Sequence, residues 1–87
     1  MSVLVRMSIA GMDAATYDQV STHLVELVKK QLGFVMHVAY VSPGGFSVGE
    51  VWESWAQFEK WFNENVKPNV PGEIKQEVIE LHAVVQP

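Results

Sequence analysis

The stretch "FVMHVAYVSPGGFSVGEVWE" occupies residues 34–53 and consists of two apolar runs joined by a short turn. Apolar, β-branched runs separated by a Pro/Gly turn are typical of an antiparallel hairpin, so we predict strands over Phe34–Val41 and Phe46–Glu53. A histidine and a carboxylate, His37 and Glu50, interrupt this apolar pattern. Their presence in an otherwise hydrophobic hairpin raises the question of what they do.

The turn sets which residues face each other. If the "SPGG" connection is symmetric, Val41 lies opposite Phe46, and the pairs then step outward along the two strands. This register makes His37 and Glu50 direct cross-strand neighbours, with Cβ atoms about 5 Å apart. The same register predicts a third pair, which is Val35 with Trp52.

The rest of the chain supplies two helices and two further strands. Alternation predicts a strand over Val3–Ile9, and helical spacing after the N-cap Asp13 predicts a helix over Ala14–Leu32, which Gly33 ends. The capping box "SWAQ" at 54–57 begins a second helix, and Pro68 ends it. A last strand is predicted over Glu77–Val85. The order β-α-β-β-α-β indicates an α+β, ferredoxin-like fold: a four-stranded antiparallel sheet with two helices on one face.

The composition favours a homodimer. The chain has 87 residues, of which 48% are hydrophobic, and we predict one domain over residues 1–87. So short a chain has a marginal core of its own, yet apolar residues occupy both faces of several strands. We expect the sheet face without helices to pair with the same face of a second copy.

The charge and the residue types exclude several classes of partner. The net charge of −4 and a pI near 5.2 argue against nucleic acid and against an anionic membrane surface. The absence of cysteine removes thiolate metal sites and disulfides, and it agrees with a cytoplasmic protein. Neither a signal peptide nor a membrane span is expected, and neither a resident metal nor a cofactor.

The predicted pair of His37 and Glu50 is the candidate catalytic site. A carboxylate beside a histidine favours the imidazolium, whereas burial disfavours it, and a group balanced in this way suits acid–base chemistry. Three interpretations stay open: a satisfied structural contact, a group that orients a ligand or handles protons, and a metal ligand. The third needs more ligands than the pair supplies.

Four other residues are candidates for ligand binding. Tyr17 lies on the buried helical stripe, either as a core residue or with its hydroxyl in a pocket between helix and sheet. Trp52 and Phe58 belong either to the core or to an aromatic pocket wall. Arg6 interrupts its strand and either meets an anionic ligand or pairs with Glu80. Trp61 lies off the stripe of its helix, so we expect it in a subunit contact.

The segments "GFVMHVAYVSPGGFSVGEVWES" and "FEKWFNENVKP" resemble small proteins of the dimeric α+β barrel superfamily, in particular its antibiotic-biosynthesis-monooxygenase-like branch with many short bacterial members of unassigned function. The resemblance implies a homodimeric barrel with helices outside and a pocket in each subunit between sheet and helices. Members include cofactor-independent oxygenases acting on polycyclic phenols, lactone isomerases and heme-degrading enzymes. The second helix has no histidine, so the resemblance does not extend to heme ligation.

Two hypotheses follow. In the first, the protein is a cofactor-independent oxygenase or isomerase of a small apolar or aromatic metabolite, with His37 as base or hydrogen-bond donor and Glu50 setting its tautomer. In the second, it is a noncatalytic metabolite-binding or structural module, and the polar pair only fixes the register of the strands.

Overall fold

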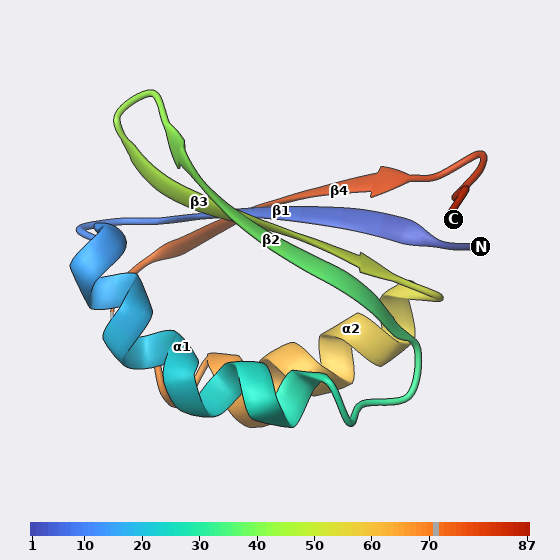
Figure 1. Ribbon diagram of the computed structural model, residues 1–87, viewed down its shortest axis with the longest axis horizontal. Helices are drawn as coiled ribbons and strands as arrows, with labels where there is room; N and C mark the ends of the chain where they lie inside the picture. Colours follow the sequence, from blue (N-terminus) through green and yellow to red (C-terminus); the bar gives the residue numbers. More distant parts are fainter. Residues whose placement is uncertain (71) are drawn as a thin grey trace.

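The structure is a computed structural model that describes residues 1–70 and 72–87. The elements follow in the order β1 (Val3–Ile9), α1 (Ala14–Val28), β2 (Phe34–Ser42), β3 (Gly45–Trp52), α2 (Trp55–Trp61), the π-helical turn η1 (Phe62–Val66) and β4 (Ile74–Glu80). The β-α-β-β-α-β prediction is therefore confirmed. Both helices lie on one side of the sheet and leave its other side open (Figure 1).

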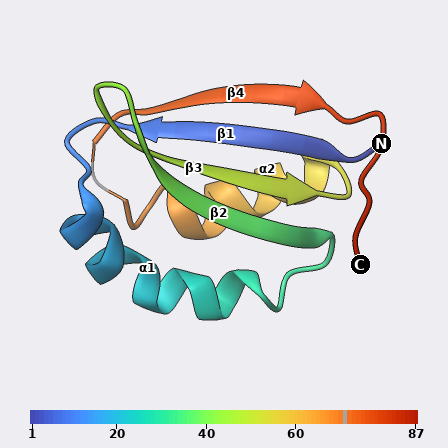
Figure 2. The ribbon, with the colours of Figure 1, turned by 45° about the horizontal axis from the view of Figure 1, so that its top comes forward.

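The four strands form one antiparallel sheet in the order β2-β3-β1-β4. Figure 2 shows β1 and β3 in the middle of this sheet and β4 and β2 at its edges. The predicted bounds of the last strand, Glu77–Val85, are wrong, because β4 pairs with β1 from Ile9↔Ile74 to Val3↔Glu80. The length of the strand follows its partner β1 and not the apolar residues near the end of the chain.

The hairpin register is confirmed at the pair that matters most. His37 lies opposite Glu50, and Val41 lies opposite Phe46, as a symmetric turn requires. The register shifts between Phe34 and Met36, however, so Trp52 lies opposite Phe34. The predicted pair of Val35 with Trp52 is therefore wrong, because an irregularity at the far end of β2 absorbs one residue.

Helix α1 begins as predicted and ends early. The Asp13 carboxylate accepts from the Thr16 backbone N–H at 2.8 Å, which caps the first turn. The helix ends at Val28 and not at Leu32, because the chain tightens into i→i+3 bonds such as Gln31 N–H to the Val28 carbonyl, 3.0 Å. Gly33, at φ +88°, then turns the chain into β2.

The second helical segment changes its period halfway. Ser54 caps α2 as predicted, with its Oγ accepting from the Gln57 backbone N–H at 3.2 Å. After Trp61 the chain makes a π turn, in which the Lys67 N–H donates to the Phe62 carbonyl at 2.9 Å. A π turn brings residues five apart onto one side of the helix, so Trp61 and Val66 are both buried. The prediction that Trp61 lies in a subunit contact is wrong, since only 2% of its surface is exposed.

The core lies between the sheet and the helices. Alternate residues of β1 point into it, and it is closed by aromatic side chains from β3 and α2. Trp52 packs edge-on against Phe58 at 6.0 Å, and both are fully buried. Helix α1 contributes less, because among its residues only Val28 is buried and the rest of its apolar face is half-buried.

The open face of the sheet has an apolar end and a polar end. At one end Leu4 on β1 has the apolar neighbours Ile79 and Val51, and Val51 has Met36. At the other end Ser8 lies between Lys75 and Ser47, and the two serine hydroxyls are 3.1 Å apart. The expectation of an apolar open face is thus correct for one end only.

No helix in residues 1–70 and 72–87 is long and apolar enough to cross a membrane.

Candidate functional site

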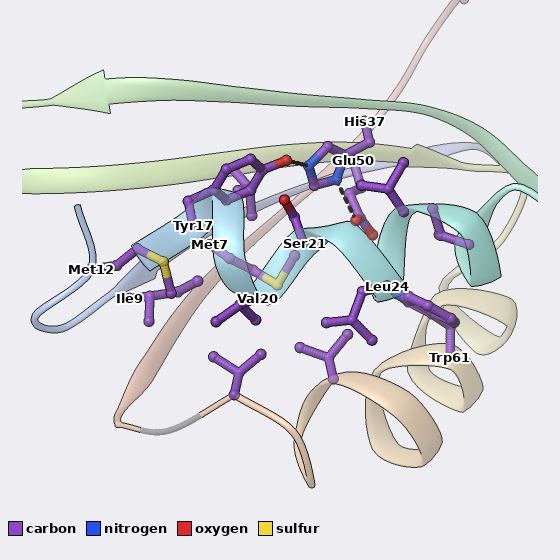
Figure 3. A pocket seen from close by; sticks show the side chains of 15 residues that line it. Met7, Ile9, Met12, Tyr17, Val20, Ser21, Leu24, His37, Glu50 and Trp61 are labelled. Carbon is purple, nitrogen blue, oxygen red and sulfur yellow. Dashed lines mark hydrogen bonds and ion pairs between the residues drawn. The ribbon is translucent and has the colours of Figure 1, made fainter. Parts of the chain in front are cut away.

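A pocket with a volume of about 60 Å³ lies between α1, the sheet and the second helical segment. Figure 3 shows its side chains gathered from β1, α1, β2, β3 and the second helical segment. Most of the lining is aliphatic, from residues such as Met7, Val20, Leu24 and Val48. The polar groups that reach it are few and belong to Tyr17, Ser21, His37, Glu50 and Trp61.

Three of these polar residues form a continuous hydrogen-bonded chain. The Tyr17 hydroxyl lies 2.7 Å from His37 Nε2, and His37 Nδ1 lies 2.7 Å from Glu50 Oε2 (Figure 3). The pair His37–Glu50 arises from the hairpin register, and α1 brings Tyr17 against it across the edge of the pocket. The structure therefore places three of the six predicted site residues at the pocket.

Trp52 fixes the far end of this chain. Its indole Nε1–H donates to Glu50 Oε1 at 3.0 Å, so each carboxylate oxygen of Glu50 accepts one hydrogen bond. Only 4% of Glu50 is exposed, and a buried carboxylate is retained only where donors satisfy it. Trp52 thus supports the site and does not line the pocket, contrary to its prediction as a ligand contact.

The carboxylate determines the tautomer of His37. An ionised carboxylate only accepts, so the proton lies on His37 Nδ1, and in the neutral ring Nε2 accepts from the Tyr17 hydroxyl. Both ring nitrogens are then occupied. Among Tyr17, His37 and Glu50, the atom left to bind a ligand is therefore the Tyr17 oxygen, which can still accept a hydrogen bond.

The surroundings of Tyr17 keep its hydroxyl neutral. Burial raises the pKa of Tyr17, the Ser21 hydroxyl opposes this shift, and the negative charge of Glu50 adds to it. The Tyr17 ring packs at 5.1 Å from Phe46 and at 6.0 Å from the imidazole of His37, nearly parallel to the latter. These contacts fix the direction of the hydroxyl.

Sequence reasoning did not predict two polar lining residues, Ser21 and Trp61. The more informative of the two is Trp61. Its Nε1 is a buried side-chain nitrogen without a hydrogen-bond partner among residues 1–70 and 72–87. Figure 3 shows Trp61 at the side of the pocket opposite Tyr17, with its indole nitrogen directed inward. A buried donor without a partner costs about 1–3 kcal/mol, so an acceptor in the pocket would relieve that cost. Trp61 is the last residue of α2, three residues after the buried Phe58, and the π turn that follows puts Val66 on the same side. No signal in the sequence marks this turn.

Two further predicted ligand-binding residues, Phe58 and Arg6, also lie outside the pocket. Phe58 is fully buried in the core, where it packs against Trp52, so its alternative interpretation as a core residue is correct. Arg6 lies on the open face, where it donates to Glu77 Oε1 at 3.2 Å and to the Tyr40 hydroxyl at 3.3 Å. The predicted pairing of Arg6 with Glu80 is wrong, because the register puts Glu77 beside it.

A metal ion has few ligands to use here. Within the described ranges 1–70 and 72–87, no three His, Asp or Glu side chains lie together as a possible metal site. Both nitrogens of His37 are already hydrogen-bonded to Tyr17 and Glu50. The arrangement is that of a proton-transfer chain, with a hydroxyl at the pocket, an imidazole behind it and a carboxylate as its support.

No protein-family model matches the sequence, and neither does any curated protein. Solved structures are similar over nearly the whole chain. SnoaB, a cofactor-independent oxygenase from Streptomyces nogalater, is 14% identical, with a TM-score of 0.65 over 99% of this chain and 96% of its own. The monooxygenase from the ActVA-Orf6 gene of Streptomyces coelicolor, in complex with nanaomycin D, is 16% identical, with a TM-score of 0.63 over 99% and 91%.

A protein of unknown function from Nitrosomonas europaea is 18% identical, with a TM-score of 0.65 over 99% of this chain and 92% of its own. Identities this low establish similarity of fold and not of activity. The resemblance inferred from the hairpin and the second helix is confirmed at that level: the chain has the ferredoxin-like fold of the antibiotic-biosynthesis-monooxygenase-like proteins.

Proposed function

We propose that this protein binds a small apolar or aromatic metabolite in the pocket and acts on it as a cofactor-independent oxygenase or isomerase. The observation that carries the proposal is the hydrogen-bonded chain of Tyr17, His37 and Glu50, which ends at the pocket. A chain of this kind moves a proton between the pocket and a buried base. One protein of similar fold, SnoaB, is a cofactor-independent oxygenase, which supports the same chemistry.

The proposed step is removal of an acidic proton from the ligand. The Tyr17 O–H bond breaks toward His37 Nε2 as the Tyr17 oxygen takes the proton from a carbon next to a carbonyl group. The ligand becomes an enolate, and His37 becomes an imidazolium beside the Glu50 carboxylate. In an isomerase the proton returns to a different carbon. In an oxygenase the enolate carbon bonds to dioxygen, and the peroxide that forms takes the proton back from His37 through Tyr17. The resulting hydroperoxide loses water to leave a new carbonyl group.

Trp61 supports the proposal from the other side of the pocket. The negative charge of an enolate collects on its oxygen, and an oxygen directed away from Tyr17 lies toward the unpartnered Trp61 Nε1–H. A fixed donor at the position of developing charge lowers the barrier of such a step, typically by about 3–4 kcal/mol.

The size of the pocket determines how a ligand enters. A cavity of about 150 Å³ holds benzene, whereas this one measures about 60 Å³. A ring-sized ligand therefore displaces the wall that is held least firmly. That wall is α1, whose apolar face is only half-buried.

The test uses 2-tetralone, an apolar ketone with acidic hydrogens beside its carbonyl group. Exchange of these hydrogens for deuterium in heavy water, followed by proton NMR, measures the proposed step directly. We expect the protein to accelerate exchange by about 100-fold or more, Tyr17→Phe to abolish the acceleration, and Tyr40→Phe to retain it, because Tyr40 lies on the open face. Equal rates for Tyr17→Phe and the unmodified protein would overturn the proposed role.

The second candidate function is a noncatalytic binding or structural module. It is favoured by the complete satisfaction of the pair His37–Glu50 and by the small pocket. Under this alternative, 2-tetralone shifts the Trp61 indole N–H resonance in a ¹⁵N-labelled sample, but the exchange rate stays at that of buffer. If 2-tetralone causes neither a resonance shift nor faster exchange, only the structural role remains.

We also propose that the single domain pairs with a second copy through the open face. The support is the apolar end of this face, where Met36 is 43% and Val38 is 48% exposed. Neighbouring apolar side chains that are this exposed are unusual on a sheet face that nothing covers. Light scattering should report a dimer. Val38→Lys should convert it to a monomer, whereas Val41→Lys, at an 80% exposed position beside the hairpin turn, should not. A dimer that persists in Val38→Lys would exclude this face.

A further inference from the structure

Tyr17 has the surroundings of a redox-active tyrosine. A phenol that loses one electron becomes a strong acid, so its oxidation is easy only where a base accepts the proton in the same step. His37 Nε2 lies 2.7 Å from the Tyr17 oxygen and, in the tautomer set by Glu50, carries a lone pair directed at it. The acceptor for that proton is therefore already in place.

The charge left by the transfer is also accounted for. When Nε2 takes the proton, His37 becomes an imidazolium whose Nδ1–H still donates to Glu50 at 2.7 Å. The Glu50 carboxylate is buried, so it stabilises the imidazolium more than an exposed carboxylate would. The ring of Tyr17 packs against Phe46 at 5.1 Å and lies nearly parallel to the imidazole of His37 at 6.0 Å, so aromatic neighbours cover part of it.

We propose that Tyr17 is a one-electron donor, which reduces an oxidising organic radical such as a phenoxyl held in the pocket. The Tyr17 ring gives up one electron, the O–H bond breaks, and a new bond forms between that proton and His37 Nε2. The phenoxyl ligand gains the electron and becomes a phenolate. The products are a tyrosyl radical, an imidazolium paired with Glu50, and the reduced ligand.

This property goes beyond the proposed acid–base function and does not depend on turnover of a substrate. The chain provides its own comparison, because it contains two tyrosines. Tyr40 accepts a hydrogen bond from the guanidinium of Arg6 at 3.3 Å. A neighbouring cation disfavours loss of an electron, and an arginine cannot take the proton. Tyr17 should therefore be oxidised in preference to Tyr40.

The experiment oxidises the protein by one electron with flash-generated ruthenium(III) tris-bipyridine and identifies the radical by freeze-quench electron paramagnetic resonance. We expect a tyrosyl signal in the unmodified protein and in Tyr40→Phe, and its loss in Tyr17→Phe. His37→Gln provides a second variant, since glutamine accepts the hydrogen bond but cannot take the proton, and should slow formation of the signal by about tenfold or more. Circular dichroism confirms that each variant folds.

Three results would overturn the proposal: a signal that survives in Tyr17→Phe, a radical confined to tryptophan, or an unchanged rate in His37→Gln. Because no ketone or other ligand is present, failure here leaves the exchange experiment with 2-tetralone unaffected. The reverse also holds, so the two proposals are separately testable.

Discussion

Replacing Glu50 by glutamine tests the central geometry of the site, because the two side chains have the same shape and differ in their hydrogen-bonding groups. The carboxylate accepts from His37 Nδ1 at 2.7 Å and from Trp52 Nε1 at 3.0 Å. Glutamine offers one acceptor oxygen, and its amide NH2 group must then face the other donor. A hydrogen bond to a charged group contributes about 1.5–3 kcal/mol, so we expect Glu50→Gln to lower the free energy of unfolding by about 2 kcal/mol.

Urea denaturation followed by tryptophan fluorescence measures this change, and a melting curve provides an independent value. For a domain of this size, about 2 kcal/mol corresponds to a fall in Tm of about 8–16 °C. The matched control is Glu53→Gln, the next glutamate along the chain, which is exposed and should change stability by less than about 0.5 kcal/mol. If Glu50→Gln costs no more than this control, Glu50 is not an ionised acceptor of two hydrogen bonds.

A double-mutant cycle with Trp52→Phe sharpens the result. Phenylalanine keeps the aromatic packing but removes the Nε1–H donor, so the glutamine at position 50 then has one donor left to satisfy. Trp52→Phe should therefore lower the free energy of unfolding by less in the Glu50→Gln background than in the unmodified protein, with a coupling energy of about 1 kcal/mol. Strictly additive costs would mean that Trp52 and Glu50 do not interact.

Two further measurements test the surroundings of the site. Burial raises the pKa of Tyr17. The stability that the neutral Tyr17 side chain contributes should therefore be complete below the unfolded tyrosine pKa of about 10 and be lost as the pH rises through the folded pKa. Ultraviolet titration of Tyr40→Phe, in which Tyr17 is the remaining tyrosine, should show this late ionisation, and an ordinary tyrosine titration would contradict it. Gly33→Ala should cost about 1 kcal/mol more than Gly44→Ala in urea denaturation. Both residues have positive φ, but a Cβ at position 33 displaces the Gln57 amide, which then loses the hydrogen bond that it accepts from Ser54 Oγ at 2.9 Å, and equal costs would contradict this contact.

The hairpin shows which parts of the site a sequence determines. A short, symmetric turn sets the register over the residues next to it, so the pair of His37 with Glu50 followed from the turn alone. The irregularity between Phe34 and Met36 lies at the other end of β2, where the turn no longer constrains the pairing. The turn therefore does not predict that Phe34 lies opposite Trp52.

The errors elsewhere have three physical causes. Strand β4 is an edge strand with polar residues such as Lys75 and Gln76, and its limits come from backbone pairing with β1, which the apolar content of the segment does not report. Trp61 was placed outside the core because the pattern assumed 3.6 residues per turn, whereas the π turn after it changes that period. Arg6 shows a third limit, because strand alternation predicts two faces without saying which one the helices cover.

The role of each group in the site follows from how many of its hydrogen bonds are already made. His37 uses both ring nitrogens within the protein, so in the proposed reaction it acts on a ligand only through Tyr17. Substitutions at His37 should therefore change the rate of proton transfer more than ligand affinity. Tyr17 and Trp61 reach the pocket with capacity to spare, so their removal should change affinity as well. Tyr17 stands near the start of α1, the least buried wall. A ligand that displaces this start of the helix therefore lengthens the Tyr17–His37 hydrogen bond, whereas one that displaces only the later turns at Val20 and Leu24 does not. A ligand must therefore seat without opening that bond if the proton is to reach His37, and this requirement selects flat molecules that enter along the helix face over bulky ones that push the start of the helix away.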